Sequence, residues 1–293
     1  STRPHPGQVQ TAAELRWLLR ESTIQTAHHG DDHRVQDPYS LRCVPQVHGA
    51  ARDALDNLRR VLDIELNSAT DNPLVFPGGG NVPEDALATG HGLVIGGGNF
   101  HGEPIALALD YAKLAIAELG SISERRVALL LDPRLNDGLP AFLGASTGLD
   151  SGLMILQYTA AALASESKTL AHPASADSIP TSANQEDHVS MGSIAARNAM
   201  TVLEHTERIV AIELICASQG LDLRLDLQPQ NAPGLGVAEA HARVRAGVPR
   251  LHEDREPGPD LEAAFRLVHD GTLVDLAGTW PLVGTSWLGP DPR

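Results

Sequence analysis

The longest helical pattern in the sequence, residues 185–220, constrains the fold more than any other feature. Apolar side chains recur there every three or four positions over about ten helical turns, and the series consists of Val189, Ile194, Met200, Leu203, Ile209, Ile212 and Leu214. Gly220 follows as a residue type that often ends a helix. So long a helix needs neighbours of similar length to bury its apolar side, and we therefore expect a bundle of long helices.

The same periodicity predicts further helices over residues 11–20, 45–67, 103–131, 148–170, 237–246 and 260–268. Ser123-Glu124-Arg125-Arg126 interrupts the apolar series of residues 103–131 and indicates a second segment there. Residues 68–100 are expected to be loop, because Asp71-Asn72-Pro73 and Gly78-Gly79-Gly80 mark turns. We find no alternating strand pattern and no internal repeat.

The predicted fold class is therefore all-α, with long, roughly antiparallel helices. We expect residues 1–225 to form the main helical part. Residues 226–293 carry several Pro and Gly and are expected to be a loop-rich segment with short helices. Because helices this long rarely complete their burial within one chain, we also expect a homo-oligomer.

The composition supports a helical core and excludes several classes of function. Hydrophobic residues make up 42% of the 293 residues and aromatic residues only 3%, which suits helices packed through Leu, Ala, Val and Ile. The net charge of −15 argues against nucleic-acid binding and against binding to an anionic membrane surface. No apolar run reaches transmembrane length. The two cysteines, Cys43 and Cys216, fit a reducing compartment, so the cytoplasm is the expected location.

The chain begins with Ser1-Thr2-Arg3-Pro4-His5-Pro6 and has neither an initiator Met nor a signal-peptide pattern. This start indicates processing, cleavage, or a chain that begins within a longer protein.

A polar stretch, residues 178–190, interrupts the apolar helical sequence with two amides, two carboxylates and an imidazole within five residues. Pro180 ends any regular structure that precedes it, and Thr181 and Ser182 are residue types that cap helix N-termini. A helix starting here would point free N–H groups and its positive dipole end at an anionic substrate or at a carboxylate such as Glu186. The alternative is an ordinary capped helix with a solvated first turn.

Residues 35–44 hold a second polar group, Gln36, Tyr39 and Arg42, at a spacing of three. Even a loosely helical backbone would place these side chains on one face. The Arg42 guanidinium could then bind a substrate carboxylate in bidentate fashion, or it could pair with a neighbouring acid of the protein.

Two other stretches look like binding motifs, but each lacks a feature that its motif requires. The tract His28-His29-Gly30-Asp31-Asp32-His33 has no helical or hairpin spacing that would fix metal ligands, so a polar loop is preferred and no metal is expected. The glycines at 96–98 are not followed by Lys-Ser/Thr, so they do not form a phosphate loop. We expect them to be a flexible approach that presents Phe100.

Three loop–helix junctions, around Tyr39, Phe100 and Glu186, therefore hold the polar chemistry of the chain. Arg42 offers a carboxylate clamp, and Tyr39 offers a phenol for proton transfer or oxyanion stabilisation. Phe100 offers an aromatic ring for packing, and Glu186 offers a carboxylate whose pKa its surroundings can shift. This set suits proton abstraction beside a carbonyl or amine of a small amino acid. No activated Ser or Cys nucleophile is recognisable.

Five motifs between about residue 3 and about residue 225 resemble the aromatic amino-acid lyase family. They are Gln36-Asp37-Pro38-Tyr39-Ser40-Leu41-Arg42-Cys43, Asp71-Asn72-Pro73-Leu74, Gly97-Gly98-Asn99-Phe100-His101-Gly102-Glu103-Pro104, Ser123-Glu124-Arg125-Arg126 and Thr181-Ser182-Ala183-Asn184-Gln185-Glu186-Asp187-His188-Val189-Ser190. The Asn-Gln-Glu-Asp-His form of the last motif is similar to the histidine branch. The phenylalanine and tyrosine branches usually have Asn-Gln-Asp there.

This resemblance implies elimination of ammonia from L-histidine to give trans-urocanate. It implies a homotetrameric bundle of the fumarase/aspartase-like superfamily, with active sites that are each shared by several subunits. Arg42 would bind the substrate carboxylate, Tyr39 would lie beside the electrophile and the reacting carbons, and Gln36 would hydrogen-bond near the electrophile.

The remaining site residues follow from the same resemblance. Phe100 would pack against the electrophile or the substrate. Glu186 would meet the imidazole or assist proton transfer, and Gln185 would bind substrate beside it.

The departures from the family pattern concern the electrophile. In this family it is a methylidene-imidazolone made from an internal Ala-Ser-Gly, and the sequence contains no such tripeptide. Asp150-Ser151-Gly152 lacks the Ala, and the family's N-terminal catalytic tyrosine loop has no counterpart. Residues 77–95 also form a longer loop than usual. The resemblance is therefore to a C-terminal part, and an N-terminal portion of the same enzyme would supply the electrophile.

Three functions remain open at this point. The chain is one piece of a working lyase, or a lyase-derived helical assembly module with no activity alone, or part of another aromatic amino-acid lyase or a 2,3-aminomutase on the same scaffold. An argininosuccinate-lyase-like enzyme is disfavoured, because no Gly-Ser-Ser-rich loop is present. An in-frame Ala-Ser-Gly upstream of Ser1 would decide between the lyase and the module.

Overall fold

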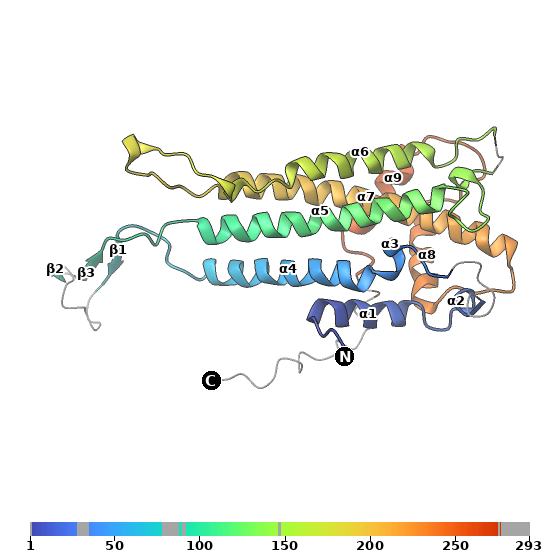
Figure 1. Ribbon diagram of the computed structural model, residues 1–293, viewed down its shortest axis with the longest axis horizontal. Helices are drawn as coiled ribbons and strands as arrows, with labels where there is room; N and C mark the ends of the chain where they lie inside the picture. The colour runs from blue at the N-terminus through green and yellow to red at the C-terminus, as the bar shows by residue number, and fades with distance from the viewer. Residues whose placement is uncertain are drawn as a thin grey trace.

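The computed structural model describes residues 2–27, 35–77, 88–89, 92–145, 148–274 and 276 of the chain. Its long helices lie side by side and alternate in direction (Figure 1). They are α4 (Val44–Glu65), α5 (Glu103–Leu131), α6 (Met154–Leu170) and α7 (Gly192–Leu227), and α1 (Pro6–Leu18) packs along α4. The predicted all-α bundle of long antiparallel helices is confirmed.

Shorter elements connect and close this bundle. The described helices also include α2 (Thr23–Ala27), α3 (Tyr39–Arg42), α8 (Leu235–Gly247) and α9 (Gly258–His269), and the single turns η1 (Ala141–Leu143), η2 (Ala174–Ala176) and η3 (Ser182–Asn184). Both α8 and α9 pack on α7. The division expected after residue 225 falls inside α7, close to its C-terminal end.

The interface between α5 and α7 forms the centre of the bundle. Ala106 on α5 and Ala195 on α7 are fully buried, and such small side chains let helix backbones approach closely. A Cβ added at Gly120 would lie 2.9 Å from Thr206 Oγ1, so a glycine is needed at this crossing. Thr206 Oγ1 donates a hydrogen bond to the Ile116 carbonyl oxygen at 3.1 Å and ties the two helices together.

The apolar core lies where α8 and α9 close over α5, α6 and α7. Its largest members are aliphatic and include Val127, Leu131, Leu143, Leu156, Ile209, Ile212, Val244 and Val248. Burying a side chain of this size stabilises the fold by about 1.5–3 kcal/mol. Cys216 is also fully buried there, and burial raises the pKa of its thiol, so Cys216 is an inert core residue.

Many large apolar side chains on the long helices are exposed in the single chain. More than a third of the surface is accessible at Leu107, Tyr111, Leu114, Ile155, Tyr158, Ile194 and Met200. Exposed apolar surface of this extent is typical of subunit interfaces. Among the described residues, no helix has the length and apolarity that crossing a membrane requires.

A small antiparallel sheet projects from the end of the bundle, between α4 and α5 (Figure 1). Its strands are β1 (Leu74–Phe76), β2 (Ala88–Thr89) and β3 (Gly92–Ile95), in the order β1-β3-β2, with Val75 opposite Val94. The expectation that residues 68–100 contain no strand was therefore wrong. Strands of two to four residues are too short to show alternation along the sequence.

Two predicted helix boundaries inside the bundle also need correction. Residues 123–126 do not start a second segment, because α5 continues through them without a break. Helix α6 begins at Met154 and not near residue 148. The Asp254 carboxylate accepts hydrogen bonds from the backbone N–H groups of Ser151 and Gly152, at 2.7 and 2.9 Å, and Gly152 has a φ of +54°. These contacts hold the residues before Met154 in a turn.

Candidate functional site

One group of predicted site residues lies at α3, a single turn that follows Pro38 and leads through Cys43 into α4. The guanidinium carbon of Arg42 lies 4.7 Å from the centre of the Tyr39 ring, which is a cation–π distance. Both side chains are exposed, Tyr39 by 70%. In the described ranges, no carboxylate lies within ion-pair distance of Arg42. Its guanidinium is therefore available to an external anion.

Gln36 is exposed in the bend that precedes α3. The structure brings Tyr39 and Arg42 into contact, as their spacing predicts. Gln36 lies outside the helical turn that carries these two side chains.

A partly buried ion pair fixes α3 against the bundle. Arg126 on α5 binds the carboxylate of Glu213 on α7 through two nitrogens, with Nη2 2.8 Å from Oε2. Ser123 Oγ donates to the same oxygen at 2.6 Å. Arg126 Nη1 also donates to the carbonyl oxygen of Ser40 at 3.5 Å. The backbone of α3 therefore rests on a charge pair whose two side chains are only 14% and 20% exposed.

His48 on α4 completes this network. Its Nε2 lies 3.5 Å from Arg126 Nη1, and since a guanidinium can only donate, His48 accepts. Burial, and then the positive charge of Arg126, lower the pKa of His48 from 6.5 to about 4, although the Glu213 carboxylate acts in the opposite direction. His48 is therefore neutral at pH 7.

The second group of predicted residues lies just before α5. Phe100 is 55% exposed, and Asn99 Nδ2 donates to the Ala69 carbonyl oxygen at 2.6 Å. His101 Nδ1 accepts the backbone N–H of Glu103 at 3.3 Å. The proton of a neutral imidazole must then be on Nε2, which lies 3.0 Å from the His188 carbonyl oxygen and donates to it.

The third group of predicted residues, around Glu186, lies beside the second group. His101 joins the two, because it binds the carbonyl oxygen of His188 in the segment that carries Glu186. The His101 and His188 rings are also close, with centroids 5.7 Å apart. A Cβ added at Gly102 would lie 3.0 Å from Ser190 Oγ, so the Gly102 backbone also lies close to the Ser190 side chain. Two of the three predicted junctions therefore meet within one chain.

Glu186 lies at the end of a tight turn. Thr181 and Glu186 exchange backbone hydrogen bonds, from Thr181 N to Glu186 O at 2.9 Å and from Glu186 N to Thr181 O at 3.3 Å. Thr181 Oγ1 also donates to Glu186 Oε2 at 2.5 Å. Gln185 lies inside the turn, and its backbone N–H is bound to the Ser182 carbonyl oxygen at 3.1 Å.

The backbone of this turn is strained. Ser182, Ala183 and Asn184 have φ values of +49°, +53° and +68°, and such left-handed conformations cost roughly 1–2 kcal/mol per residue without glycine. The predicted helix start at residue 185 was therefore wrong, since α7 begins at Gly192. The residues expected to cap that helix instead form the turn, so the dipole of α7 does not start at Glu186. Strain of this kind clusters at functional sites.

The two regions lie far apart along α5. Arg126 contacts α3, whereas Phe100 and His101 precede Glu103 at the other end of the helix (Figure 1). The helix from Glu103 to Arg126 is about 35 Å long at about 1.5 Å per residue. Within a single chain, Arg42 therefore cannot act on the same small molecule as Glu186.

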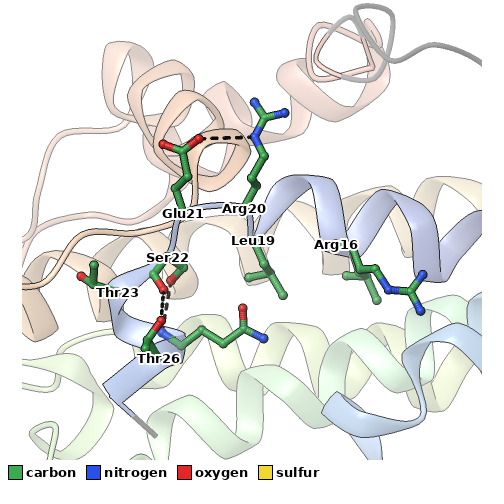
Figure 2. Close-up of a pocket in the computed structure, with 9 residues that line it drawn as sticks. Arg16, Leu19, Arg20, Glu21, Ser22, Thr23 and Thr26 are labelled. Carbon is green, nitrogen blue, oxygen red and sulfur yellow. Dashed lines mark hydrogen bonds and ion pairs between the residues drawn. The ribbon is translucent and has the colours of Figure 1, made fainter. Parts of the chain in front are cut away.

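Open hollows in the described part of the chain include two of similar size. One, of about 590 Å³, lies beside Asn99 and His101, between the end of α4 and the start of α5. The other, of about 550 Å³, lies between α1 and α2 and is lined by Arg16, Leu19 and Arg20 among others (Figure 2). Figure 2 shows that the Arg16 and Arg20 side chains point in different directions, so they do not converge on one ligand.

Within the described ranges, no group of three His, Cys, Asp or Glu side chains could hold a metal ion. The tract at residues 28–33 lies outside the described residues.

Comparison with known proteins decides the family. Residues 1–246 match the sequence profile of aromatic amino acid lyases. The chain belongs to the aromatic amino acid lyase family. It is 52% identical over 272 residues to the histidine ammonia-lyase of Natranaerobius thermophilus, covering 93% of this chain and 50% of that protein. It is 54% identical to the enzyme of Sorangium cellulosum, with 93% and 51% coverage.

Solved structures of the aromatic amino acid lyase family share its fold. The crystal structure of Trypanosoma cruzi histidine ammonia-lyase matches with a TM-score of 0.80 and 45% identity, over 95% of this chain and 49% of that one. A tyrosine aminomutase from Streptomyces globisporus matches with a TM-score of 0.81 and 36% identity, over 95% and 53%. The chain thus spans about half the length of the relatives that it matches.

Sequence reasoning missed the residues that support the site. The polar run at residues 123–126 was a visible signal for Arg126, but it was interpreted as a break in the helix. Thr181 was interpreted as a helix cap, although its side chain binds Glu186. His101 was named only as a neighbour of Phe100, and nothing local in the sequence indicates its contact with His188.

Proposed function

We propose that this chain is the C-terminal part of a histidine ammonia-lyase, which eliminates ammonia from L-histidine to give trans-urocanate. The observation that carries the proposal is Arg42, an exposed guanidinium that stacks on Tyr39 and has no carboxylate partner among the described residues. It offers a bidentate site to the substrate carboxylate, with a phenol beside it. Identities above 50% to histidine ammonia-lyases support histidine as the substrate.

The proposed roles follow the chemistry of each side chain. Arg42 binds the substrate carboxylate, and Tyr39 exchanges a proton near the reacting carbons. Glu186 accepts an imidazole N–H or assists proton transfer, and Gln185 binds substrate beside it.

Gln36 and Phe100 complete the proposed site around the electrophile. Gln36 hydrogen-bonds near the electrophile. The exposed ring of Phe100 packs against the electrophile or the substrate.

The electrophile of this proposal is a methylidene-imidazolone formed from an Ala-Ser-Gly in the N-terminal portion of the enzyme. The present sequence has no Ala-Ser-Gly, so its residues fit the role of surrounding the group and not of forming it. Tyr39 and Phe100 are 70% and 55% exposed, and their rings offer flat surfaces beside which such a group can pack. When bound, the group supplies the electron sink for loss of the amino group.

We further propose that the complete site forms between copies of the chain, in a homotetramer. The separation of Arg42 and Glu186 along α5 requires a second copy to bring them to one substrate. The exposed apolar side chains of α5, α6 and α7 provide surface for such an assembly. The expected location of the enzyme is the cytoplasm.

A second candidate is a 2,3-aminomutase, because a tyrosine aminomutase matches this fold as well as the histidine enzyme does. The products discriminate the two: a lyase releases ammonia and urocanate, whereas an aminomutase gives a β-amino acid. A helical assembly module without catalysis is the third candidate, and the complete protein would then give neither product.

The test is urocanate formation from L-histidine, followed by ultraviolet absorbance. We expect the full-length protein to form urocanate and residues 1–293 alone to form none. In the full-length protein, Glu186→Gln should lower turnover far more than it lowers the melting temperature. Urocanate production by the isolated chain, or no production by the full-length protein, would contradict the proposal.

A further inference from the structure

The Thr181 hydroxyl makes a short contact with the carboxylate of Glu186. Oγ1 donates to Oε2 at 2.5 Å, a distance typical of a charge-assisted O–H···O⁻ hydrogen bond. Among the interactions of the described residues, no partner is found for the other carboxylate oxygen, Oε1. The two oxygens of Glu186 are therefore not equivalent.

The hydroxyl is not needed to close the turn. The backbone hydrogen bonds between residues 181 and 186, at 2.9 and 3.3 Å, already pair its ends. A second closure follows just outside it, where Ser178 Oγ accepts the Val189 N–H at 2.7 Å and donates to the Val189 carbonyl oxygen at 3.0 Å. The backbone hydrogen bonds hold the turn, and the contact of Thr181 with the Glu186 carboxylate orients the Glu186 side chain.

The turn also gives Thr181 a fixed direction. Thr is branched at Cβ, which restricts its χ1 rotamers, and the extended backbone at Thr181 (φ −132°) precedes three left-handed residues. The chain reverses within these residues, so positions 181 and 186 lie opposite each other. The hydroxyl thus reaches the carboxylate across the turn.

We propose that Thr181 is a positioning residue that binds Oε2 of Glu186 and leaves Oε1 as the acceptor for the imidazole N–H of the substrate. This inference rests on the proposed function, in which Glu186 contacts the histidine ring. Without the hydroxyl, the Glu186 side chain rotates more freely and presents either oxygen. Binding of the imidazole then weakens, while the turn persists.

The test compares Thr181→Val, which keeps the shape and removes the hydroxyl, with Thr181→Ser, which keeps the hydroxyl. Both are made in the full-length enzyme. We expect Thr181→Val to lower kcat/KM for histidine by about tenfold or more, and Thr181→Ser to stay within about threefold of the parent. If Thr181→Val fails to assemble, Thr181→Ala provides a second variant without the hydroxyl. In a Glu186→Leu background, which leaves no acceptor for the hydroxyl, Thr181→Val should have no further effect.

Product inhibition separates this role from a merely structural one. trans-Urocanate carries an imidazole N–H, whereas trans-cinnamate has none, so Thr181→Val should weaken inhibition by urocanate and leave inhibition by cinnamate unchanged. Equal weakening of both, or a Thr181→Val enzyme within twofold of the parent while Glu186→Gln is impaired, would overturn the inference alone. A fully active Glu186→Gln enzyme would overturn the proposed role of Glu186, and this inference with it.

Discussion

Arg126, near the C-terminal end of α5, donates to the carbonyl oxygen of Ser40 inside α3 at 3.5 Å. This contact places the Tyr39–Arg42 pair beside one end of α5, whereas His101 joins the Phe100 and Glu186 segments at the other end. The long helix therefore separates the two halves of the candidate site and holds each in place. Each half also has its own supporting network, which can be tested separately.

The first prediction concerns the ion pair that supports α3. Arg126→Leu leaves the Glu213 carboxylate partly buried without its partner, and we expect a loss of about 3 kcal/mol in the free energy of unfolding. Urea unfolding measures this loss. Removing both charges, in Arg126→Leu/Glu213→Leu, should restore much of it. As a control, Arg134→Leu removes a guanidinium whose side chain is 85% exposed, and it should leave the unfolding midpoint near that of the parent.

The second prediction concerns the pH dependence of stability. The pKa of His48 is about 4 in the folded protein, because of burial and the charge of Arg126, against 6.5 for an ordinary histidine. Above pH 6.5 both states hold His48 neutral, and it has no effect. As the pH falls from 6.5 to 4 the unfolded state takes up the proton first, so stability decreases, by on the order of 2–3 kcal/mol.

Urea unfolding between pH 4 and 7 measures this loss, with His48→Gln as the comparison. The variant cannot bind the proton, so its stability should fall less steeply over this range. Equal slopes for parent and variant would show that His48 is not held neutral in the folded state.

The third prediction concerns the hydrogen bond between His101 and His188. His101→Gln keeps a donor near the position of Nε2, whereas His101→Leu removes it. We expect amide hydrogen exchange in residues 181–190 to become faster by about fivefold or more in His101→Leu, because the lost hydrogen bond contributes about 1 kcal/mol. His101→Gln should exchange at close to the parent rate. His252→Leu, at an exposed histidine, serves as the control, and faster exchange there too would contradict a specific role of His101.

The fourth prediction concerns the carboxylate clamp. In the full-length enzyme, Arg42→Ala should lower kcat/KM for histidine by about 100-fold or more, since a clamp of this kind contributes about 3 kcal/mol. The melting temperature should change little, because Arg42 is exposed and contacts mainly the Tyr39 ring. Arg42→Lys keeps the charge but not the bidentate geometry and should recover only part of the activity. Activity within a few-fold of the parent in Arg42→Ala would remove Arg42 from the site.

Much of the bundle could be predicted from the sequence, because its signals are local. The bounds predicted for α5 are correct at both ends. Glu103 and Pro104 are residue types that mark the first turn of a helix. The start of α7 could not be predicted in the same way. Thr181 and Ser182 are residue types that cap helices. In the structure, hydrogen bonds from Thr181 to the side chain and backbone of Glu186 stabilise a left-handed turn instead. No local residue preference predicts those hydrogen bonds.

The candidate site shows the same limit. The spacing of Tyr39 and Arg42 predicted their contact, because both lie on one helical turn. The sequence could not show that Arg42 and Glu186 lie at different ends of α5, since that distance depends on how the helices pack. The polar run at residues 123–126 made Arg126 visible, but its supporting role could not be predicted for the same reason, since its partner, Glu213, is on another helix.

The most direct test of the shared site is complementation between two inactive variants of the full-length enzyme. Arg42→Ala and Glu186→Gln, co-expressed with different tags and purified through both, should form mixed oligomers in which about a quarter of the sites have both residues intact. We predict that these mixed oligomers regain a corresponding share of the parent activity. Oligomers mixed from Arg42→Ala and Tyr39→Phe, which alter the same half of the site, should regain none. If verified mixed oligomers of Arg42→Ala and Glu186→Gln stay inactive, the claim that different copies supply Arg42 and Glu186 is contradicted.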